Sequence, residues 1–195
     1  MKYTLNRNRR AQRGFTIVEL IITISIIALL SILAIPFARG IIIGGKVEPT
    51  SNDINKVVTK IRGSFAGQGV APYLNLGAPA AATAVFSNSA RGLASALTIT
   101  GAGAAATAQH DLGATNSQVT VAQATITVAG DSFTVTLPTV NEAACPGLAA
   151  ALSRAAEGIT VNGAVAKAVG GVFNGGAAQN ACTANDTNAF VFTFR

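Results

Sequence analysis

The chain has 195 residues, of which 50% are hydrophobic and only 11% are charged. A net charge of +6 would suit a nucleic-acid-binding protein, but five of the 14 basic residues precede residue 14, where there are no acids. The chain from Phe15 onward is therefore almost neutral. The basic excess indicates membrane topology, and we expect no specific nucleic-acid partner.

A basic leader, residues 1–14, precedes a long apolar run. From Phe15 to Ala38 the side chains are mostly apolar, and Glu19 is the one acid among them. A helix of this length measures about 36 Å, enough to cross a hydrocarbon core of ~30 Å. Because cytoplasmic flanks are rich in Lys and Arg, we expect a cytoplasmic N-terminus, with everything after Ala38 across the membrane.

Two common kinds of apolar N-terminal segment fit this run poorly. A secretory signal peptide has a short apolar core followed by small residues, whereas here the core is long and Gly14 precedes it. A plain membrane anchor gives Glu19 no role, although a carboxylate inside a membrane helix costs about 2.5–3.5 kcal/mol on insertion scales. Cleavage between Gly14 and Phe15 would create an α-amine close to Glu19, a partner of opposite charge.

At these residues the chain resembles the type IV pilins and the related type II secretion pseudopilins. The shared features are the basic leader, Gly14, Phe15 after it, and Glu19 as the fifth residue of a processed chain. The resemblance implies cleavage after Gly14 by a prepilin peptidase, N-methylation of Phe15 and a role for Glu19 in assembly. It also implies that copies leave the bacterial inner membrane to form an extracellular helical homopolymer. A pilus assembly platform and an assembly ATPase are implied as indirect partners.

Pro36 and Gly40 mark a predicted break in the first helix. Proline lacks an N–H and kinks or opens a helix, and the helices of pilins are often melted near such a proline. Gly40 and Gly44 also have the GxxxG spacing of closely packed membrane helices. Helix interruption explains these glycines at least as well.

After the leader we expect a membrane-spanning and filament-core helix over residues 15–48 and a globular head over residues 49–195. Pro49 to Ser51 interrupt the pattern, and apolar residues at helical spacing predict a second helix over Asn52–Phe65. This helix should pack one face on a sheet. Asp53 would lie in its first turn, where a carboxylate complements the helix dipole.

Alternating patterns in the second half of the chain predict an antiparallel sheet. Val119–Val128 and Phe133–Leu137 form a predicted hairpin, which Pro138 should end, and Ile159–Val165 forms another. Phe190–Phe194 is a predicted final strand. The fold class is therefore α+β, with a long N-terminal hydrophobic helix packed on an antiparallel sheet, and it resembles the pilin fold.

Other parts of the chain carry weaker signals. Residues 142–157 are Ala-rich and favour a helix, whereas residues 67–113 have too little pattern for an assignment. His110 and Asp111 could suggest acid–base chemistry, but a surface turn is the better interpretation because no nucleophile accompanies them. The eight acids are scattered, so we assign no catalytic residue and expect no enzyme activity and no cofactor.

Cys145 and Cys182 both lie in the part of the chain expected to be exported. In an oxidising compartment an isolated pair most simply forms one disulfide. A metal pair is the poorer alternative, because the chain has no Cys-x-x-Cys and one histidine. The pair bounds a C-terminal region that, in pilins, is exposed on the filament.

The resemblance leaves the branch of the family open. The size of the Cys-bounded region and the helix at its first cysteine resemble type IVb pilins, whereas the short leader and Phe15 resemble type IVa. The alternatives to a pilus subunit are a minor pilin, a type II secretion pseudopilin, and a membrane-anchored periplasmic ligand-binding or enzymatic domain. The Cys pair and long C-terminal loop favour a pilin over a pseudopilin.

Overall fold

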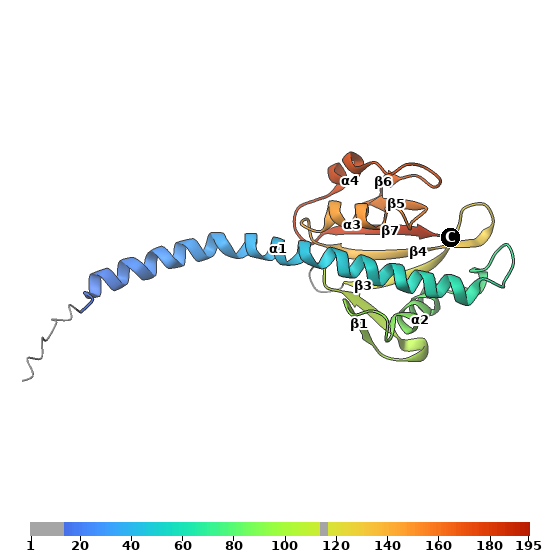
Figure 1. The fold of residues 1–195 in the computed structure, drawn as a ribbon, viewed down its shortest axis with the longest axis horizontal. Coiled ribbons are helices and arrows are strands. Elements are labelled where there is room, and N and C mark those ends of the chain that lie inside the picture. Colours follow the sequence, from blue (N-terminus) through green and yellow to red (C-terminus); the bar gives the residue numbers. More distant parts are fainter. Residues whose placement is uncertain (1–13, 114–116) are drawn as a thin grey trace, which may run out of the picture. The chain divides into compact units, whose positions relative to one another are not determined.

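The computed structural model describes residues 14–113 and 117–195, so most of the expected leader lies outside the described residues (Figure 1). The chain divides into two compact units, one ending at Ala38 and one from Arg39 to Arg195. Each unit is described by itself. We refer to the second unit as the head.

One continuous helix, α1 (Ile17–Phe65), replaces the two helices predicted from the sequence. In the single chain α1 runs without a break, so the predicted break at Pro36 and Gly40 is wrong, and so is the predicted interruption at Pro49. A proline inside a helix costs about 3 kcal/mol and removes one backbone hydrogen bond, but the bonds before and after it remain. Around Pro49 this cost is offset, because one face of α1 is buried in the core of the head.

The buried face of α1 begins before Pro49. It comprises Ile43, Val47, Ile54, Val57, Val58 and Ile61. The head therefore takes part of its core from the segment that the sequence assigned to the filament-core helix.

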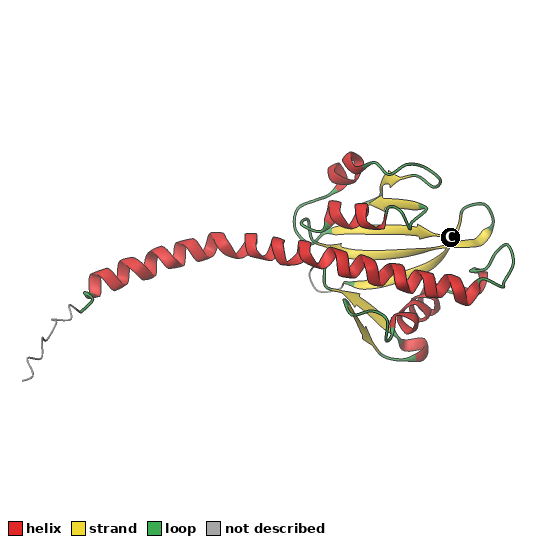
Figure 2. Ribbon diagram, in the orientation of Figure 1, coloured by secondary structure: helices red, strands yellow, loops and turns green. Residues whose placement is uncertain are grey.

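The head contains a seven-stranded antiparallel sheet with strand order β1-β2-β3-β4-β7-β5-β6 (Figure 2). Helix α1 lies along one face of this sheet, which we call the inner face (Figure 1). The strands are β1 (Leu97–Thr100), β2 (Thr107–His110), β3 (Gln118–Thr125), β4 (Ala129–Val140), β5 (Gly158–Val161), β6 (Ala164–Lys167) and β7 (Asn188–Phe194). The remaining helices are η1 (Leu74–Leu76), α2 (Pro79–Ala90), η2 (Gly103–Ala105), α3 (Cys145–Leu152) and α4 (Gly175–Ala181).

Side chains at alternate positions of the strands form the core between the sheet and α1. Phe133 on β4 and Phe190, Phe192 and Phe194 on β7 are fully buried. Leu148 and Leu152 of α3 and Phe86 of α2 complete the same cluster. The alternate positions of these strands face the other way and are rich in threonine, as a half-buried strand requires.

The predicted hairpins and the C-terminal strand are confirmed. Strands β3 and β4 pair from Thr120 to Thr125, and β5 and β6 meet at a turn in which Asn162 and Gly163 both have positive φ. Such a turn is typical of an Asn-Gly hairpin. The prediction that Pro138 ends its strand is wrong, because a register shift between Leu137 and Val140 lets β4 continue against β7.

Asp53 connects α1 to the chain that enters β1. It lies in the interior of α1 and not in a first turn, and it is almost fully buried. Its Oδ2 accepts hydrogen bonds from the backbone N–H groups of Ser95 and Ala96, at 2.6 and 2.7 Å. Burial raises the pKa of Asp53, but these bonds and Lys56 outweigh burial and leave the pKa below its usual value.

We predict that Gly113→Ala strongly destabilises the head. A Cβ at Gly113 would lie 1.7 Å from the carbonyl oxygen of Thr139, where Gly113 bridges to β4. Because backbone must move to relieve this clash, the free energy of unfolding should fall by about 3 kcal/mol or more. Urea unfolding of the detergent-solubilised full chain, followed by circular dichroism, measures the change.

Gly63→Ala is the matched control. Gly63 lies in α1 with nothing within 4 Å of the added Cβ, so alanine should stabilise the helix by about 0.5–1 kcal/mol. Equal stability of the two variants would contradict the packing described for Gly113.

Candidate functional site

Gly14 and Phe15 immediately precede α1, and Glu19 lies in its first turn. Thr16 caps the helix: its Oγ1 accepts a hydrogen bond from the N–H of Glu19 at 3.3 Å, and its carbonyl accepts from Leu20 at 3.1 Å. Thr16 and Glu19 have the Thr-x-x-Glu spacing of a capping box. The Thr-x-x-Glu spacing in the sequence was the signal for this cap, which was not among the predicted features.

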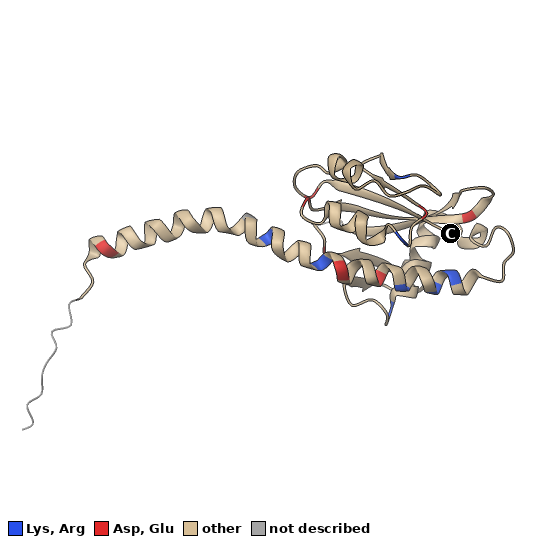
Figure 3. Cartoon of the chain, turned by 45° about the horizontal axis from the view of Figure 1, so that its top comes forward, with Lys and Arg blue, Asp and Glu red and all other residues tan. Residues whose placement is uncertain are grey.

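The Glu19 carboxylate is exposed and forms no hydrogen bond or ion pair with any residue that the structure describes. Figure 3 shows the following stretch of α1 without charge, up to the next basic residue at Arg39. Glu19 is thus the one charge on the apolar segment. Its first-turn position suits a negative charge, because it complements the helix dipole.

The side chains that follow Glu19 have no protein cover. Every large apolar side chain described from Phe15 to Phe37 is more than half exposed. The hydroxyl groups of Thr23, Ser25 and Ser31 each donate to carbonyl groups of the preceding turn, at 2.7–3.0 Å, so they do not need water. In the part of the chain described, α1 is the one helix long and apolar enough to cross a membrane.

Within the head, Gly40 and Gly44 face Ala143, in the chain just before α3. A Cβ on Gly40 would lie 3.7 Å from the Cβ of Ala143, and one on Gly44 would lie 3.9 Å from the Ala143 carbonyl oxygen. On α3, Gly147 faces Val47 in the same way, with 3.7 Å from its Cβ position to Cγ1. All three are ordinary contact distances for a Cβ, so the glycines mark where α1 faces α3 and the chain before it.

Polar and charged groups join the loop before β7 to α1 and to the chain that follows β4. Arg39 of α1 forms an ion pair with Asp186 at 2.5 Å, and Asp186 is only 14% exposed. The other carboxylate oxygen of Asp186 accepts from Asn141 Nδ2 at 2.6 Å. Glu142 accepts a hydrogen bond from the N–H of Asn185 at 3.2 Å. The loop before β7 thus binds α1 and the end of β4 together.

A pair of asparagine amides holds the other side of this loop. Asn188 is fully buried; its Nδ2 donates to the carbonyls of Val140 and Thr183, and its Oδ1 accepts from the N–H of Thr183. Asn162, in the β5–β6 turn, donates to Asn188 Oδ1 at 2.9 Å and to the Ala181 carbonyl at 2.8 Å. The sequence suggested a turn residue and gave no sign of this network.

Cys145 and Cys182 form the expected disulfide, which joins the first residue of α3 to the C-terminal end of α4. The two Cα atoms are 6.0 Å apart. Cys145 is fully buried. The disulfide closes the region that contains α3, α4 and the β5–β6 hairpin.

His110 is not on a surface turn; that interpretation is wrong. It ends β2, is 1% exposed, and its Nε2 lies 2.8 Å from the carbonyl oxygen of Pro138. The N–H of Leu112 donates to its Nδ1 at 3.2 Å, so the ring is neutral with the proton on Nε2. Burial lowers the pKa of His110, against the opposing effects of Pro138 and Asp111.

Nothing among the described residues groups three metal-ligating side chains. A hollow between β2 and β3 is lined by threonine, glutamine, alanine and proline, and has no titratable side chain in its lining. It therefore offers no acid, base or charged nucleophile for catalysis. Two other features stand out among the described residues: an exposed apolar helical segment with one acid that has no partner there, and a compact head.

Comparisons with known proteins account for both features. A family model described as PilS N terminal matches residues 46–195. The chain belongs to the PilS family of type IV pilins. A model of the prokaryotic N-terminal methylation motif matches residues 9–35, across Gly14, Phe15 and Glu19. This pilin is therefore a type IV pilus subunit.

The first of three similar solved structures supports the fold. The crystal structure of a type IVb pilin from Salmonella typhi is similar with a TM-score of 0.54 and 24% identity, over 74% of this chain and 97% of that one. An NMR structure of type IVb pilin (PilS) from Salmonella typhi gives 0.46 and 23%, over 76% and 95%. TcpA, a type IV pilin from Vibrio cholerae El Tor, gives 0.42 and 13%, over 77% and 99%. The comparison with curated proteins returned no match.

We predict that removing the disulfide destabilises the head without preventing export. The loop spans 37 residues, for which chain entropy gives about 4 kcal/mol. The double variant Cys145→Ala, Cys182→Ala should unfold at lower urea and yield fewer surface filaments, while its leader is still removed. Unchanged urea midpoints and normal filament yield would contradict a stabilising role.

We also predict an acid-sensitive component of stability from His110, the one histidine of the chain. Its pKa is lowered in the folded state, so the unfolded chain takes up the proton first. Stability should fall as the pH drops below about 6.5, by at most about 1.4 kcal/mol per pH unit, until the folded pKa is reached.

The test is to measure urea midpoints of wild type and His110→Gln from pH 7.5 to pH 5, in steps of roughly one pH unit. The glutamine variant keeps an uncharged donor and acceptor but cannot titrate, so its midpoint should vary less over this range. Parallel curves for the two proteins would exclude His110 as the source.

Proposed function

We propose that this pilin is cleaved between Gly14 and Phe15 and polymerises through α1, with Glu19 paired to the Phe15 amine of a neighbouring copy. The observation that carries the proposal is the unpaired Glu19 carboxylate at the start of an apolar helix without protein cover. Cleavage supplies the amine, and the prepilin peptidase also N-methylates it. Membership of the pilin family supports processing and self-assembly in general.

The pair acts as a gauge of register. Apolar side chains slide past one another with little preference, whereas a charge buried without a partner costs several kcal/mol. Within one straight helix, Glu19 lies about 6 Å along the axis from Phe15. A copy that docks with an axial offset of this order places its amine level with the neighbouring carboxylate. Other offsets leave both charges unpaired in a poor solvent for ions.

The same segment serves two environments in turn. Before assembly, the basic leader stays in the cytoplasm and residues 15–38 span the inner membrane, with the head on the far side. An assembly platform and, through it, an assembly ATPase then draw processed copies out of the membrane. In the extracellular pilus, the apolar segments form the core and cover one another.

We predict that Gly14→Leu blocks processing. A bulky side chain immediately before the cut does not fit a site that requires a small residue, so the precursor should stay whole in the membrane. Gly14→Ala, which remains small, should still be processed. N-terminal sequencing of the membrane and surface fractions distinguishes the two. Surface material from wild-type cells that begins at Met1 would refute cleavage at this bond.

We predict that Glu19→Ala is inserted and processed normally but assembles poorly, because the amine then has no partner in the core. The measurement is the yield of sheared filaments relative to processed protein in the membrane, in cells without wild-type subunits. Glu48→Ala, which removes an exposed acid of the head, is the control and should assemble. Abundant normal filaments from Glu19→Ala would leave the register role without support.

A further inference from the structure

The face of the sheet turned away from α1, which we call the outer face, is rich in uncharged polar side chains. They follow from the register: Thr100 opposes Thr107, Gln109 opposes Gln118, Thr120 opposes Thr136, and Thr134 opposes Thr193. None of these positions is charged. A surface of hydroxyl and amide groups can both donate and accept hydrogen bonds.

The outer face has a hollow of about 230 Å³ where β2 and β3 separate. These two strands pair only at Ala108 with Val119 and at Gln109 with Gln118. Beyond that point Thr83 of α2 takes the place of the missing strand neighbour. Its Oγ1 accepts the N–H of Val121 at 2.9 Å. The divergence of the strands therefore belongs to the fold.

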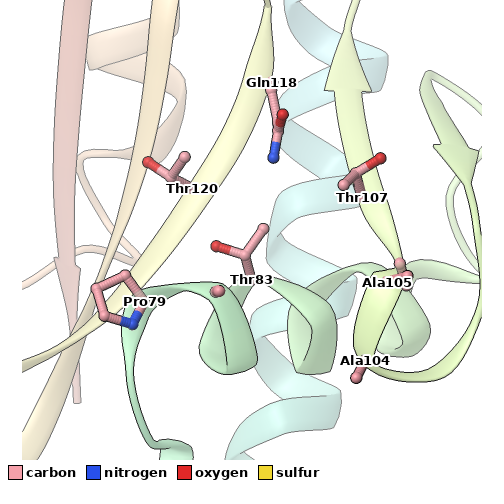
Figure 4. A pocket seen from close by; sticks show the side chains of 9 residues that line it. Pro79, Thr83, Ala104, Ala105, Thr107, Gln118 and Thr120 are labelled. Carbon is pink, nitrogen blue, oxygen red and sulfur yellow. The ribbon is translucent and has the colours of Figure 1, made fainter.

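Polar side chains converge on this hollow. Figure 4 shows Gln118, Thr120 and Thr107 around it, with Thr83 between them. Thr83 is 5% exposed, and its hydroxyl accepts one hydrogen bond but donates none to the described residues. The side chains of Gln118 and Thr120 form no hydrogen bond within the described chain. Pro79 adds an apolar wall, and Ala104 and Ala105 leave the space open.

We propose that this hollow binds one neutral sugar residue of a glycan. Sugar hydroxyls donate and accept as the threonines and Gln118 do, and the C–H face of a sugar ring can pack on Pro79. The lining has no Lys, Arg or His to select an anion and no carboxylate to select a cation. The volume is below the range of about 300–1,000 Å³ typical of drug-sized ligands and too small for a helix about 10–12 Å across.

Assembly makes a weak site useful, and in this respect the inference rests on the proposed function. No aromatic side chain lines the hollow, so binding of one sugar is weak. A homopolymer repeats the site along its length, and linked sites can raise overall affinity by about 10²–10⁴ without new contacts. The proposal therefore requires that the hollow stay open on the assembled filament.

Saturation-transfer NMR tests the site on two forms of the full-length protein, sheared filaments and detergent-dispersed chain. The probes are the methyl glycosides of glucose, galactose and N-acetylglucosamine, with sialic acid as the charged comparison. We expect ring-proton signals from at least one neutral glycoside with both forms. The dispersed chain does not depend on polymerisation, so a failure to form filaments leaves the binding test intact.

Variants assign the signal to the hollow. Thr120→Val and Gln118→Leu each remove an unused hydrogen-bonding group and should weaken binding about fivefold or more, while Ala80→Phe should block the hollow and abolish the signal. Thr98→Val, on the same face but outside the hollow, should bind as wild type does. Circular dichroism of each variant verifies folding.

Three results with either form of the protein would overturn the proposal, and a fourth follows from comparing the two forms. They are no transfer to any neutral glycoside at millimolar concentration, an undiminished signal in Ala80→Phe, and binding of sialic acid alone. Binding by the dispersed chain that disappears on assembly would also overturn it, because a neighbouring subunit would then cover the hollow.

Discussion

An apolar helix surface without protein cover must be covered by something else, and the rest of this structure depends on that constraint. Burial of one Leu, Ile or Phe side chain contributes about 1.5–3 kcal/mol, and the large apolar side chains from Phe15 to Phe37 are all more than half exposed. Their sum far exceeds any single contact in the head. The segment therefore belongs in a bilayer or among copies of itself, and assembly exchanges one cover for the other.

The same constraint gives Glu19 its importance. Apolar packing supplies most of the assembly energy but little specificity, because one apolar side chain replaces another at small cost. A single charge in that surface penalises wrong arrangements far more than it strengthens the right one. Thr16 also caps α1 in the chain itself, so Glu19, the residue proposed to set the register, lies at a well-defined helix start.

The head is built to remain rigid while the segment changes environment. The Arg39–Asp186 pair and the asparagine network bind the loop before β7 to α1, to β4 and to the β5–β6 turn. The disulfide joins α3 to the end of α4. Each of these links joins parts that are far apart in sequence. None of them uses the threonine and glutamine side chains of the outer face.

The sequence predicted those features that have a local pattern. The apolar run, the Asn162-Gly163 hairpin and the alternating strands β4 and β7 follow from composition and period. The continuity of α1 did not follow from the pattern: at Pro49 tertiary packing in the head outweighs the cost of a proline, whereas at Pro36 the helix continues without protein cover. The elements between residues 67 and 113 were missed because α2 is rich in alanine and has no apolar stripe.

Long-range polar contacts had no local pattern either. His110 resembled a turn residue in sequence, but its partners Leu112 and Pro138 come from the β2–β3 connection and from β4. Asp53 resembled a helix-dipole residue, yet it binds the chain before β1. The N-terminal motif, by contrast, could be recognised from the sequence, because Gly14, Phe15, Glu19 and the apolar run lie together in the segment that matches the methylation-motif model.

A cryo-EM reconstruction of sheared filaments tests the central claim most directly. The account predicts density that begins at Phe15, apolar segments of α1 packed at the centre, and each Glu19 carboxylate within hydrogen-bond distance of a neighbouring Phe15 amine. Density that begins before Gly14, apolar segments on the filament surface, or a Glu19 carboxylate facing solvent away from any amine would contradict it.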